Sequence, residues 1–345
     1  MLGGGIYVTQ DKVLPGSYIN FVNASTATSM IGDRGAVAIA LPLGKSAGSV
    51  IELTRSNFIK DCENLTGKKY DSKDVIALRE IFCHATKAFV YDIGSSGTVS
   101  EAIKALEPYD FNVLCAYTDT QEDITSYVDA VKKWRDETGK KCQVVVYNQT
   151  KPDHEGIINV VSTVSESSSP EYALVAWTAG AEAGCAINES CTNMIYDGEY
   201  TVVVDKTQTE LESCITNGQL AFHLVYGEVR LLEDINSLTT TTDDKGEDFK
   251  YNQTIRVIDQ IANDIAKIFN TKYLGKIPNN ESGRVSLWAD IVNHDRQLEE
   301  VQAIEDFDSS LLTVEQGNNK KSVVVNDSIK VTNSMAQLYM TVVIQ

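Results

Sequence analysis

The glycine-containing segment VYDIGSSGTVSEAI, residues 90–103, is the best candidate in this sequence for binding chemistry. Gly94 and Gly97 lie between an expected strand and an expected helix, where a phosphate could sit on the helix N-terminus. The full G-x-G-x-x-G spacing is absent, and no acidic residue is clearly placed to hold a ribose about 20 residues further on. A glycine–serine turn in any other strand–helix connection has the same sequence pattern, so the pattern is not specific for cofactor binding. The segment leaves a nucleotide-binding α/β enzyme as an alternative function.

Residues for metal binding or nucleophilic catalysis are poorly placed. No two of the histidines stand at ligand spacing, and Cys185 and Cys191 lack the C-x-x-C spacing of a zinc knuckle. No G-x-S-x-G, Walker or H-E-x-x-H motif occurs. Asp259 and Asp264 fall on the polar side of an expected helix, where a solvated face is the simpler interpretation. We therefore predict no catalytic residue, no cofactor and no metal site. The histidines are His84, His154, His223 and His294.

Composition narrows the classes of protein further. The 345 residues carry 48 acidic and 30 basic side chains, a net charge of −18, which disfavours a nucleic-acid backbone as the main partner. No apolar run approaches the roughly 20 residues of a membrane span. The first ten residues, MLGGGIYVTQ, lack the basic and apolar regions of a secretory signal. Seven cysteines, an odd number mostly inside apolar runs, are expected to be reduced thiols in a cytoplasmic protein.

Valine-rich runs alternate with helical patterns from about residue 87 to 219, which predicts parallel strands under helices on both faces. Among these runs, YTVVVDK at residues 200–206 is read as a strand. The fold class expected is α/β and α+β, with a variable α/β domain before a C-terminal α+β core and extended terminal strands. The domains expected are an arm over 1–30, a small α+β region over 31–86, the α/β domain over 87–219, the core over 220–331 and an arm over 332–345.

The C-terminal third has the clearest helical pattern. Isoleucines spaced by three and four residues predict an amphipathic helix around Asn252–Phe269. A second helix is expected over 284–304, a hairpin around Gly227, and two strands around a turn at Gly317–Asn319. These elements predict a compact α+β unit after the α/β domain.

The segment MAQLYMTVVIQ, Met335 to Gln345, alternates with a period of two. Leu338, Met340, Val342 and Ile344 share one face of a β-strand, and Tyr339 lies on the other. A hydrophobic strand with a free edge is a template for pairing with another chain.

Several motifs resemble contractile phage tail sheath proteins, of a myovirus-type tail or an R-type bacteriocin. The segment DKVLPGSYINFVNASTATSMIGDRGAVAIALPL is similar to the N-K-V-x-P-G-x-Y-I-N-F and D-R-G segments of that family, with Asp11 in place of the first Asn. VRLLEDINSLTT, RVIDQIANDIAKIF, YLGKIPNNESGRVSLWADI, VEQGNNKKSVVVNDSIKV and MAQLYMTVVI follow the family's order and spacing. The resemblance covers about residues 11–45 and 218–345, and the α/β domain between them is matched by position alone.

The resemblance implies a structural protein rather than an enzyme. Six subunits would form a disc around an inner tail tube, and discs would stack into a helical sheath that contracts and drives the tube through a cell envelope. The partners implied are other copies of the chain, the tube protein, and baseplate and tail terminator proteins, without direct nucleic-acid binding or membrane insertion. The location implied is a virion tail or bacteriocin particle, assembled in the bacterial cytoplasm.

The resemblance also implies particular contact residues. Terminal arms would add strands to a small sheet in another subunit, through Tyr18, Ile19, Phe21 and Val22 at one end and Leu338, Tyr339, Met340, Val342 and Ile344 at the other. Such strand addition agrees with the strand-forming pattern of both ends. The first long helix of the core would contact the tube through Asn252, Arg256, Asp259 and Asn263. A non-contractile oligomeric shell remains an alternative function. A sheath like that of type VI secretion is disfavoured, because such sheaths usually contain two different chains.

Overall fold

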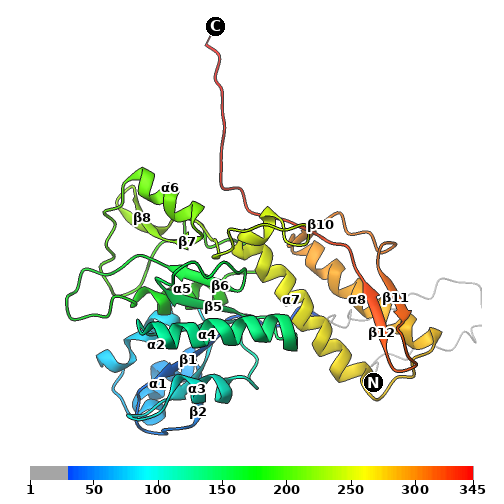
Figure 1. Ribbon diagram of the computed structural model, residues 1–345, viewed down its shortest axis with the longest axis horizontal. Helices are drawn as coiled ribbons and strands as arrows, with labels where there is room; N and C mark the ends of the chain where they lie inside the picture. Colours follow the sequence, from blue (N-terminus) through cyan, green and yellow to red (C-terminus); the bar gives the residue numbers. More distant parts are fainter. Residues whose placement is uncertain (1–29, 345) are drawn as a thin grey trace, which may run out of the picture.

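A computed structural model describes residues 30–344 of the chain. Figure 1 shows two units side by side and a single extended segment that projects away from both. The α/β unit ends with β9 (Glu228–Leu231), and the C-terminal unit begins with α7 (Asn252–Ile268). In the described range no helix combines the length and the apolar character that crossing a membrane requires.

A seven-stranded sheet in the order β2-β3-β1-β4-β5-β6-β7 forms the centre of the α/β unit. Neighbouring strands run parallel, except that the edge strand β2 is antiparallel to β3. The predicted parallel pairing is confirmed for all but this edge. The strands are β1 (Ala36–Leu41), β2 (Val50–Thr54), β3 (Lys87–Asp92), β4 (Val113–Cys115), β5 (Gln143–Tyr147), β6 (Ile157–Val160) and β7 (Gln219–Leu220).

The predicted boundary at residue 86 lies inside this sheet. β1 and β2 come from the region expected to be a small α+β domain, yet they pair with β3 and β4 of the following region. Residues 31–219 therefore share one sheet instead of forming two domains. The prediction of a strand over residues 200–206 is also wrong. In the described chain this segment forms a single isolated β-bridge, between Val164 and Val202, and no strand.

Helices cover both faces of the sheet (Figure 1). Val144 belongs to the core cluster that contains residues of α3 and α4, whereas Val145 belongs to the cluster that contains residues of α1, α2 and α5, because successive strand residues point to opposite faces. Burial on both sides explains why these strands are continuous apolar runs in the sequence. The helices of the unit are α1 (Arg55–Thr66), α2 (Ile76–Ile81), α3 (Val99–Leu106), α4 (Gln121–Lys133), α5 (Leu174–Gly184) and α6 (Gln208–Thr216), with short turns η2 (Lys73–Val75) and η3 (Trp134–Thr138).

The C-terminal unit packs its two long helices around a second, smaller core. Ile268 of α7 lies in one core cluster with Leu287 and Ile291 of α8. Leu312, just before the last hairpin, belongs to the same cluster. The predicted helices, the hairpin around Gly227 and the strands around Gly317–Asn319 are confirmed. β8 (Phe222–Val225) pairs with β9 at the end of the α/β unit, and η4 (Glu247–Lys250) precedes α7. The elements that follow α7 in the C-terminal unit are η5 (Phe269–Tyr273), α8 (Glu281–Glu300), β10 (Ile304–Glu305), β11 (Thr313–Gln316), β12 (Val323–Asn326) and β13 (Lys330–Val331).

The seven cysteines lie within the described chain as free thiols, and all except Cys83 are buried. Their burial agrees with the expectation that cysteines inside apolar runs act as small apolar core residues.

Candidate assembly site

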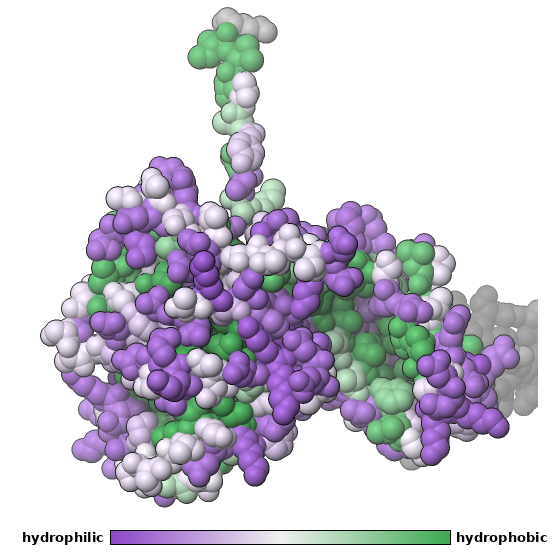
Figure 2. Space-filling model, in the orientation of Figure 1, coloured by the Kyte–Doolittle hydropathy of each residue, from purple (hydrophilic) through white to green (hydrophobic). Residues whose placement is uncertain are grey.

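The segment 335–344, called the arm here, is extended and exposed in the single chain. It belongs to no strand of the structure and projects from the C-terminal unit (Figure 1). Leu338, Met340 and Ile344 are 86%, 75% and 93% exposed. Figure 2 shows hydrophobic side chains on this projecting segment, away from the polar surface of both units. Large apolar side chains and open backbone groups on one extended segment form a strand without a sheet.

The arm is free only beyond a fixed root at residues 332–334. Gln253, in the first turn of α7, donates a hydrogen bond from Nε2 to the Thr332 carbonyl oxygen (3.2 Å) and accepts one at Oε1 from the Ser334 N–H (2.9 Å). The Thr254 hydroxyl donates to Asn333 Oδ1 (3.2 Å). Just before the root, β13 pairs with β10. These contacts define the point at which the arm leaves the fold.

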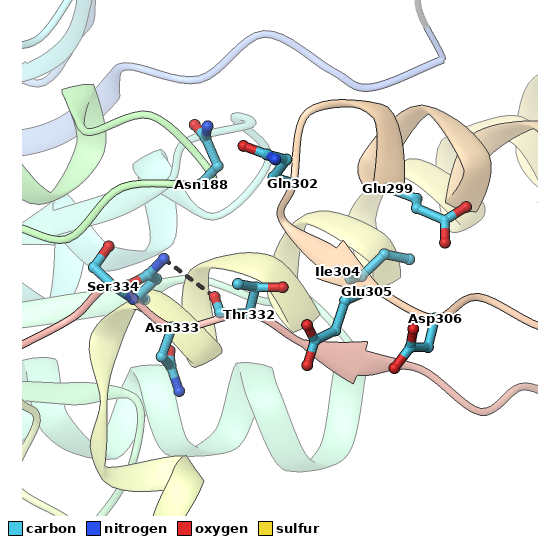
Figure 3. A pocket seen from close by; sticks show the side chains of 10 residues that line it. Asn188, Glu299, Gln302, Ile304, Glu305, Asp306, Thr332, Asn333 and Ser334 are labelled. Carbon is cyan, nitrogen blue, oxygen red and sulfur yellow. Dashed lines mark hydrogen bonds between the residues drawn. The ribbon is translucent and has the colours of Figure 1, made fainter.

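A polar cavity of about 400 Å³ lies beside this root (Figure 3). Glu299, Gln302 and Glu305 line it from the end of α8 and from β10, and Asn188 reaches it from the α/β unit. Lys330 on β13 pairs with Glu305 at 2.6 Å, so part of the acidic charge is already compensated. The cavity leaves the polar groups around the arm root open to water.

The same helix anchors the segment 30–34 that leads out of the N-terminal region. Asp264 accepts the Gly32 N–H on both carboxylate oxygens (3.1 Å each). Arg34 donates to Gln260 Oε1 and to the Glu182 carbonyl oxygen (3.3 Å each). α7 therefore holds the root of the arm in its first turn and the 30–34 segment in its third and fourth turns. The predicted N-terminal arm residues Tyr18, Ile19, Phe21 and Val22 lie outside the described residues.

The four residues predicted to contact a tube face the α/β unit of their own chain. Asn252 accepts a hydrogen bond from Gln143 (2.9 Å), and Asn263 donates to the Lys141 carbonyl oxygen (2.8 Å). Arg256 and Asp259 are only 2% and 7% exposed. As the single chain presents them, these side chains are engaged within the subunit, because the α/β unit covers the polar side of α7.

The carboxylates of α7 were predicted to be solvated, and this is wrong. Asp259 forms a two-pronged pair with Arg135 (2.5 and 2.9 Å), and Asp264 is 4% exposed beneath the 30–34 segment. The anchoring residues Gln253, Gln260 and Asp264 were missed as functional residues. Their residue types gave little signal, because Gln and Asp are mostly exposed in proteins and are buried where hydrogen bonds satisfy them.

A buried ion cluster joins α7 to the α/β unit. Arg256 pairs with Glu182 (2.7 Å) and with Asp234 (3.2 Å), and all three side chains are almost fully buried. Burial and the neighbouring Asp234 raise the pKa of Glu182, whereas the Arg256 charge lowers the pKa of Asp234 against the effect of burial. The two carboxylates therefore share one arginine, and Asp234 has the lower pKa of the two.

A buried histidine joins α7 to α8 behind the 30–34 segment. His294 places Nε2 3.1 Å from Asp264 and Nδ1 3.0 Å from Asp295. Burial opposes the charge of the ring, but the two carboxylates raise the pKa of His294 to about 9. The protonated imidazole thus holds the same carboxylate that binds the Gly32 N–H.

The Gly94–Gly97 turn is already filled by a carboxylate of the chain. Asp92 accepts the N–H groups of Leu43 (3.1 Å), Gly44 (2.8 Å), Ser46 (2.7 Å) and Gly94 (3.0 Å). These amides would otherwise be available to a phosphate. A Cβ on Gly97 would lie 2.4 Å from the Ile93 carbonyl oxygen, so close backbone approach explains this glycine. The geometry disfavours the nucleotide-binding alternative.

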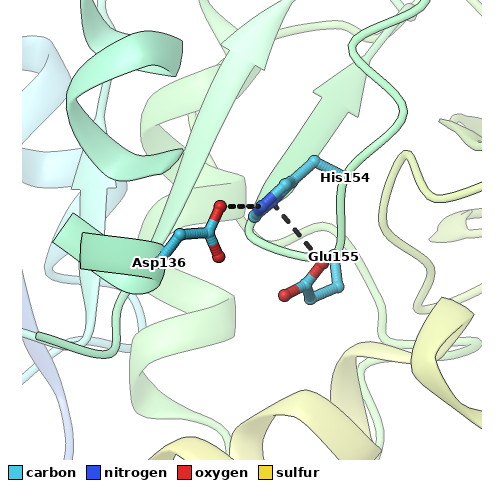
Figure 4. A group of neighbouring side chains, drawn as sticks. All are labelled: Asp136, His154 and Glu155. Atoms are coloured by element: carbon cyan, nitrogen blue, oxygen red, sulfur yellow. Dashed lines mark ion pairs between the residues drawn. The ribbon is translucent and has the colours of Figure 1, made fainter. Parts of the chain in front are cut away.

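Within residues 30–344, two groups of side chains have distances that could suit a metal ion. In the first, the His154 Nδ1 accepts the Gly156 N–H (2.9 Å), so its Nε2 carries the proton and faces Asp136 at 3.6 Å (Figure 4). Glu155 is balanced by Lys245 at 2.9 Å. In the second, Glu182, Cys191 and Asp234 surround the Arg256 guanidinium. In both groups a cationic side chain already supplies the positive charge.

Comparisons with known proteins identify the family of this chain. The family model of the phage tail sheath protein central domain matches residues 94–237, and that of the phage tail sheath C-terminal domain matches residues 244–345. This chain belongs to the phage tail sheath family.

Individual relatives support the assignment. The tail sheath protein of Clostridium phage phiCD119 is 29% identical over 76% of this chain and 74% of its own length. Two Bacillus subtilis relatives match over 54% and 55% of their lengths, so the chain spans about half of each. The crystal structure of a sheath tail protein from Desulfitobacterium hafniense has a TM-score of 0.79 at 23% identity, over 94% of this chain and 99% of that one. The contracted helical sheath of the anti-feeding prophage shares the fold at 12% identity, with a TM-score of 0.69 over 97% and 99%.

Proposed function

We propose that this protein is the repeating subunit of a contractile tail sheath and that its arm joins one copy to the next by adding a strand to a neighbour's sheet. The observation that carries the proposal is the contrast between the arm and its root. The root at residues 332–334 is fixed by Gln253 and Thr254, while the alternating apolar residues beyond it have no sheet of their own. An exposed strand of this kind gains hydrogen bonds and apolar burial only when another copy supplies the sheet.

The hairpin β11–β12 is the acceptor that we propose. In the described chain each of its strands pairs only with the other, so both outer edges are open. Val324 and Val325 are 46% and 38% exposed, as in an incompletely covered sheet. A groove beside β11 is lined by Val285 and Trp288 of α8, which offer apolar surface to an added strand. The N-terminal arm, with Tyr18, Ile19, Phe21 and Val22, would supply the second added strand.

The anchoring of both chain segments on α7 supports a sheath that stays connected while its subunits move. Because α7 is also bound to the α/β unit through buried ion pairs, a pull on the arm root reaches the whole subunit. In the proposed particle six copies form a disc, discs stack around an inner tube, and contraction drives the tube through a target envelope. Tethered copies give each weak strand addition a high effective concentration.

The remaining partners follow from the same proposal. The sheath would meet a tube protein, a baseplate and a tail terminator, in a virion tail or bacteriocin particle assembled in the bacterial cytoplasm. The tube contact is proposed for the C-terminal unit as a whole, because Asn252, Arg256, Asp259 and Asn263 are engaged with the α/β unit. The net charge of −18 favours a soluble outer surface.

The test compares two neighbouring arm positions. Met340→Asp puts a charge on the apolar face, and Thr341→Asp puts the same charge on the opposite face. Both residues are exposed in the single chain, so both variants should fold as wild type does. We expect Thr341→Asp to form long striated tubes in electron micrographs and Met340→Asp to stay monomeric in sedimentation. Normal tubes from Met340→Asp would overturn the strand-addition proposal.

A further inference from the structure

A cavity of about 470 Å³ lies at the carboxyl edge of the seven-stranded sheet, far along the chain from the arm. It is bounded by Leu41 at the end of β1, Ile93 just after β3 and Tyr117 just after β4. β1 has β3 on one side and β4 on the other, so the strand order reverses here. Open α/β sheets bind ligands in the crevice at such a reversal, and this volume is within the range of about 300–1,000 Å³ typical of small-molecule sites.

The walls of the cavity combine aromatic rings with hydrogen-bonding groups. Tyr117 and Tyr172 meet at 85° with their ring centroids 4.9 Å apart, so they form a corner. Burial raises the pKa of Tyr117 above its usual range and that of Tyr200 to about 12, so both phenols stay protonated near neutral pH. Tyr127 and Asp123 stand one turn apart on α4. The residues that carry the argument are Tyr117, Tyr127, Tyr172, Tyr200, Asp123 and Lys73.

The charges around the cavity are balanced. Lys73 donates to the Ser168 hydroxyl (3.2 Å), and Asp74 is paired with Lys68 (3.0 Å). Asp123 is half-buried, and no ion pair engages it within residues 30–344. The lining therefore offers one ammonium donor, Lys73, and one carboxylate acceptor, Asp123, to a ligand.

An anionic ligand is disfavoured by the backbone around the cavity. The backbone amides at this edge of the sheet, which would bind a phosphate, already donate to the Asp92 carboxylate. A neutral ligand that offers one apolar face and many hydroxyl groups fits better. Its C–H face can pack on a tyrosine ring, whose face is electron-rich, while its hydroxyls reach a carboxylate acceptor and an ammonium donor.

We infer that this cavity is a saccharide-binding site of the α/β unit, which takes a neutral hexopyranose ring against Tyr117 and Tyr172 and holds its hydroxyls through Asp123 and Lys73. The site is separate from the arm and the hairpin β11–β12. Binding therefore does not depend on assembly, and a subunit that fails to form tubes still binds the sugar.

The test uses the full chain and saturation-transfer NMR with methyl glucoside, methyl galactoside and N-acetylglucosamine as probes. Wild type should transfer saturation to the ring protons of at least one of the three. Asp123→Asn should weaken that binding by about 10-fold or more, because a hydrogen bond to a charged acceptor is lost. Ser169→Trp adds bulk at the partly exposed lining without removing a packed side chain, and it should abolish binding. Tyr226→Ala, at a fully exposed tyrosine outside the cavity, is the matched control and should leave binding unchanged.

The melting temperature of each variant shows whether it is folded. If Asp123→Asn melts well below wild type, Ser169→Trp tests the site in its place. Absence of saturation transfer from all three sugars would overturn the inference, as would transfer that persists in Ser169→Trp. Binding of tetramethylammonium or inorganic phosphate, lost in Ser169→Trp and without any sugar binding, would overturn the saccharide class. Tetramethylammonium would indicate a cation site, and phosphate would indicate an anion site.

Discussion

The α/β unit and the arm use the same kind of sequence in opposite ways. β5 reads QVVVY, and all five of its residues are buried between helices on both faces of the sheet. The arm reads LYMTVVI over residues 338–344, and its apolar side chains stand in solvent. Both segments have strand-forming residues, but only β5 has neighbouring strands in its own chain. A strand pattern thus specifies a strand, whereas the surrounding fold determines which molecule completes it.

The C-terminal unit is intermediate between the α/β unit, which completes its own sheet, and the arm, which has no sheet in its own subunit. Its helices share a small apolar core, and α7 is joined to the α/β unit by buried ion pairs as well as by apolar contact with Ile187. Buried ion pairs contribute little net stability compared with apolar packing, yet breaking one partner is costly. The interface therefore favours one relative arrangement of the two units. Truncation and substitution can test how far the arm, the C-terminal unit and the α/β unit depend on one another for folding.

Deletion of Leu338–Gln345 should give the largest effect on assembly and almost none on the fold. The deleted side chains up to Ile344 are exposed in the single chain, so the urea midpoint should match that of wild type. Tubes should be absent in electron micrographs, because the strand donor is gone. A truncated chain that unfolds at lower urea would show that the arm packs on its own subunit.

Arg256→Met should give the largest loss of stability. It leaves Glu182 and Asp234 buried without their cation, which costs about 3–5 kcal/mol in the free energy of unfolding. Lys68→Met, which breaks the partly exposed pair with Asp74, should cost at most about 1 kcal/mol and serves as the control. Urea denaturation measures both. A loss below about 1 kcal/mol for Arg256→Met would mean that the cluster relaxes or admits water.

Two histidines should make the two units respond to pH in opposite directions. In the C-terminal unit, carboxylates raise the pKa of His294 to about 9, so its contribution is complete below the unfolded pKa of about 6.5 and is lost as pH rises through about 9. In the α/β unit, burial lowers the pKa of His154, so its contribution is present above pH of about 6.5 and weakens as pH falls below it.

Thermal melting from pH 5 to 10 tests this contrast. His294→Gln should remove the alkaline loss of stability and keep the acidic one, and His154→Gln should do the reverse. An alkaline loss of equal size in wild type and His294→Gln would show that other groups cause it.

The smallest effect is expected from nucleotides. ATP, GTP and NAD should not shift the melting temperature, because Asp92 already occupies the amides beside Gly94. A clear stabilisation would restore the enzyme alternative. Gly97→Ala would then test the position of the ligand, since the added methyl group crowds the Ile93 carbonyl.

Periodicity predicted the elements with strong local patterns. The isoleucine spacing located α7 to within one residue of its end, and the glycine at Gly227 located the hairpin β8–β9. Alternation predicted the parallel sheet, but not that β1 and β2 belong to it, because strand partners distant in sequence leave no local signal. The polar side of α7 looked solvated for the same reason. A helix with one apolar face gives no sign that its other face meets a second unit.

The sequence by itself determined the type of each long element, the alternation of the arm and the resemblance of its motifs to the sheath family. These features depend on residues close together along the chain. Only the tertiary structure decided that Asp259 and Arg256 are buried, that α7 holds both the arm root and the 30–34 segment, and that Asp92 fills the glycine turn. Most of these contacts join groups that are far apart along the chain, such as Gln253 with Thr332 and Asp264 with Gly32, and the groups meet only because burial brings their elements together.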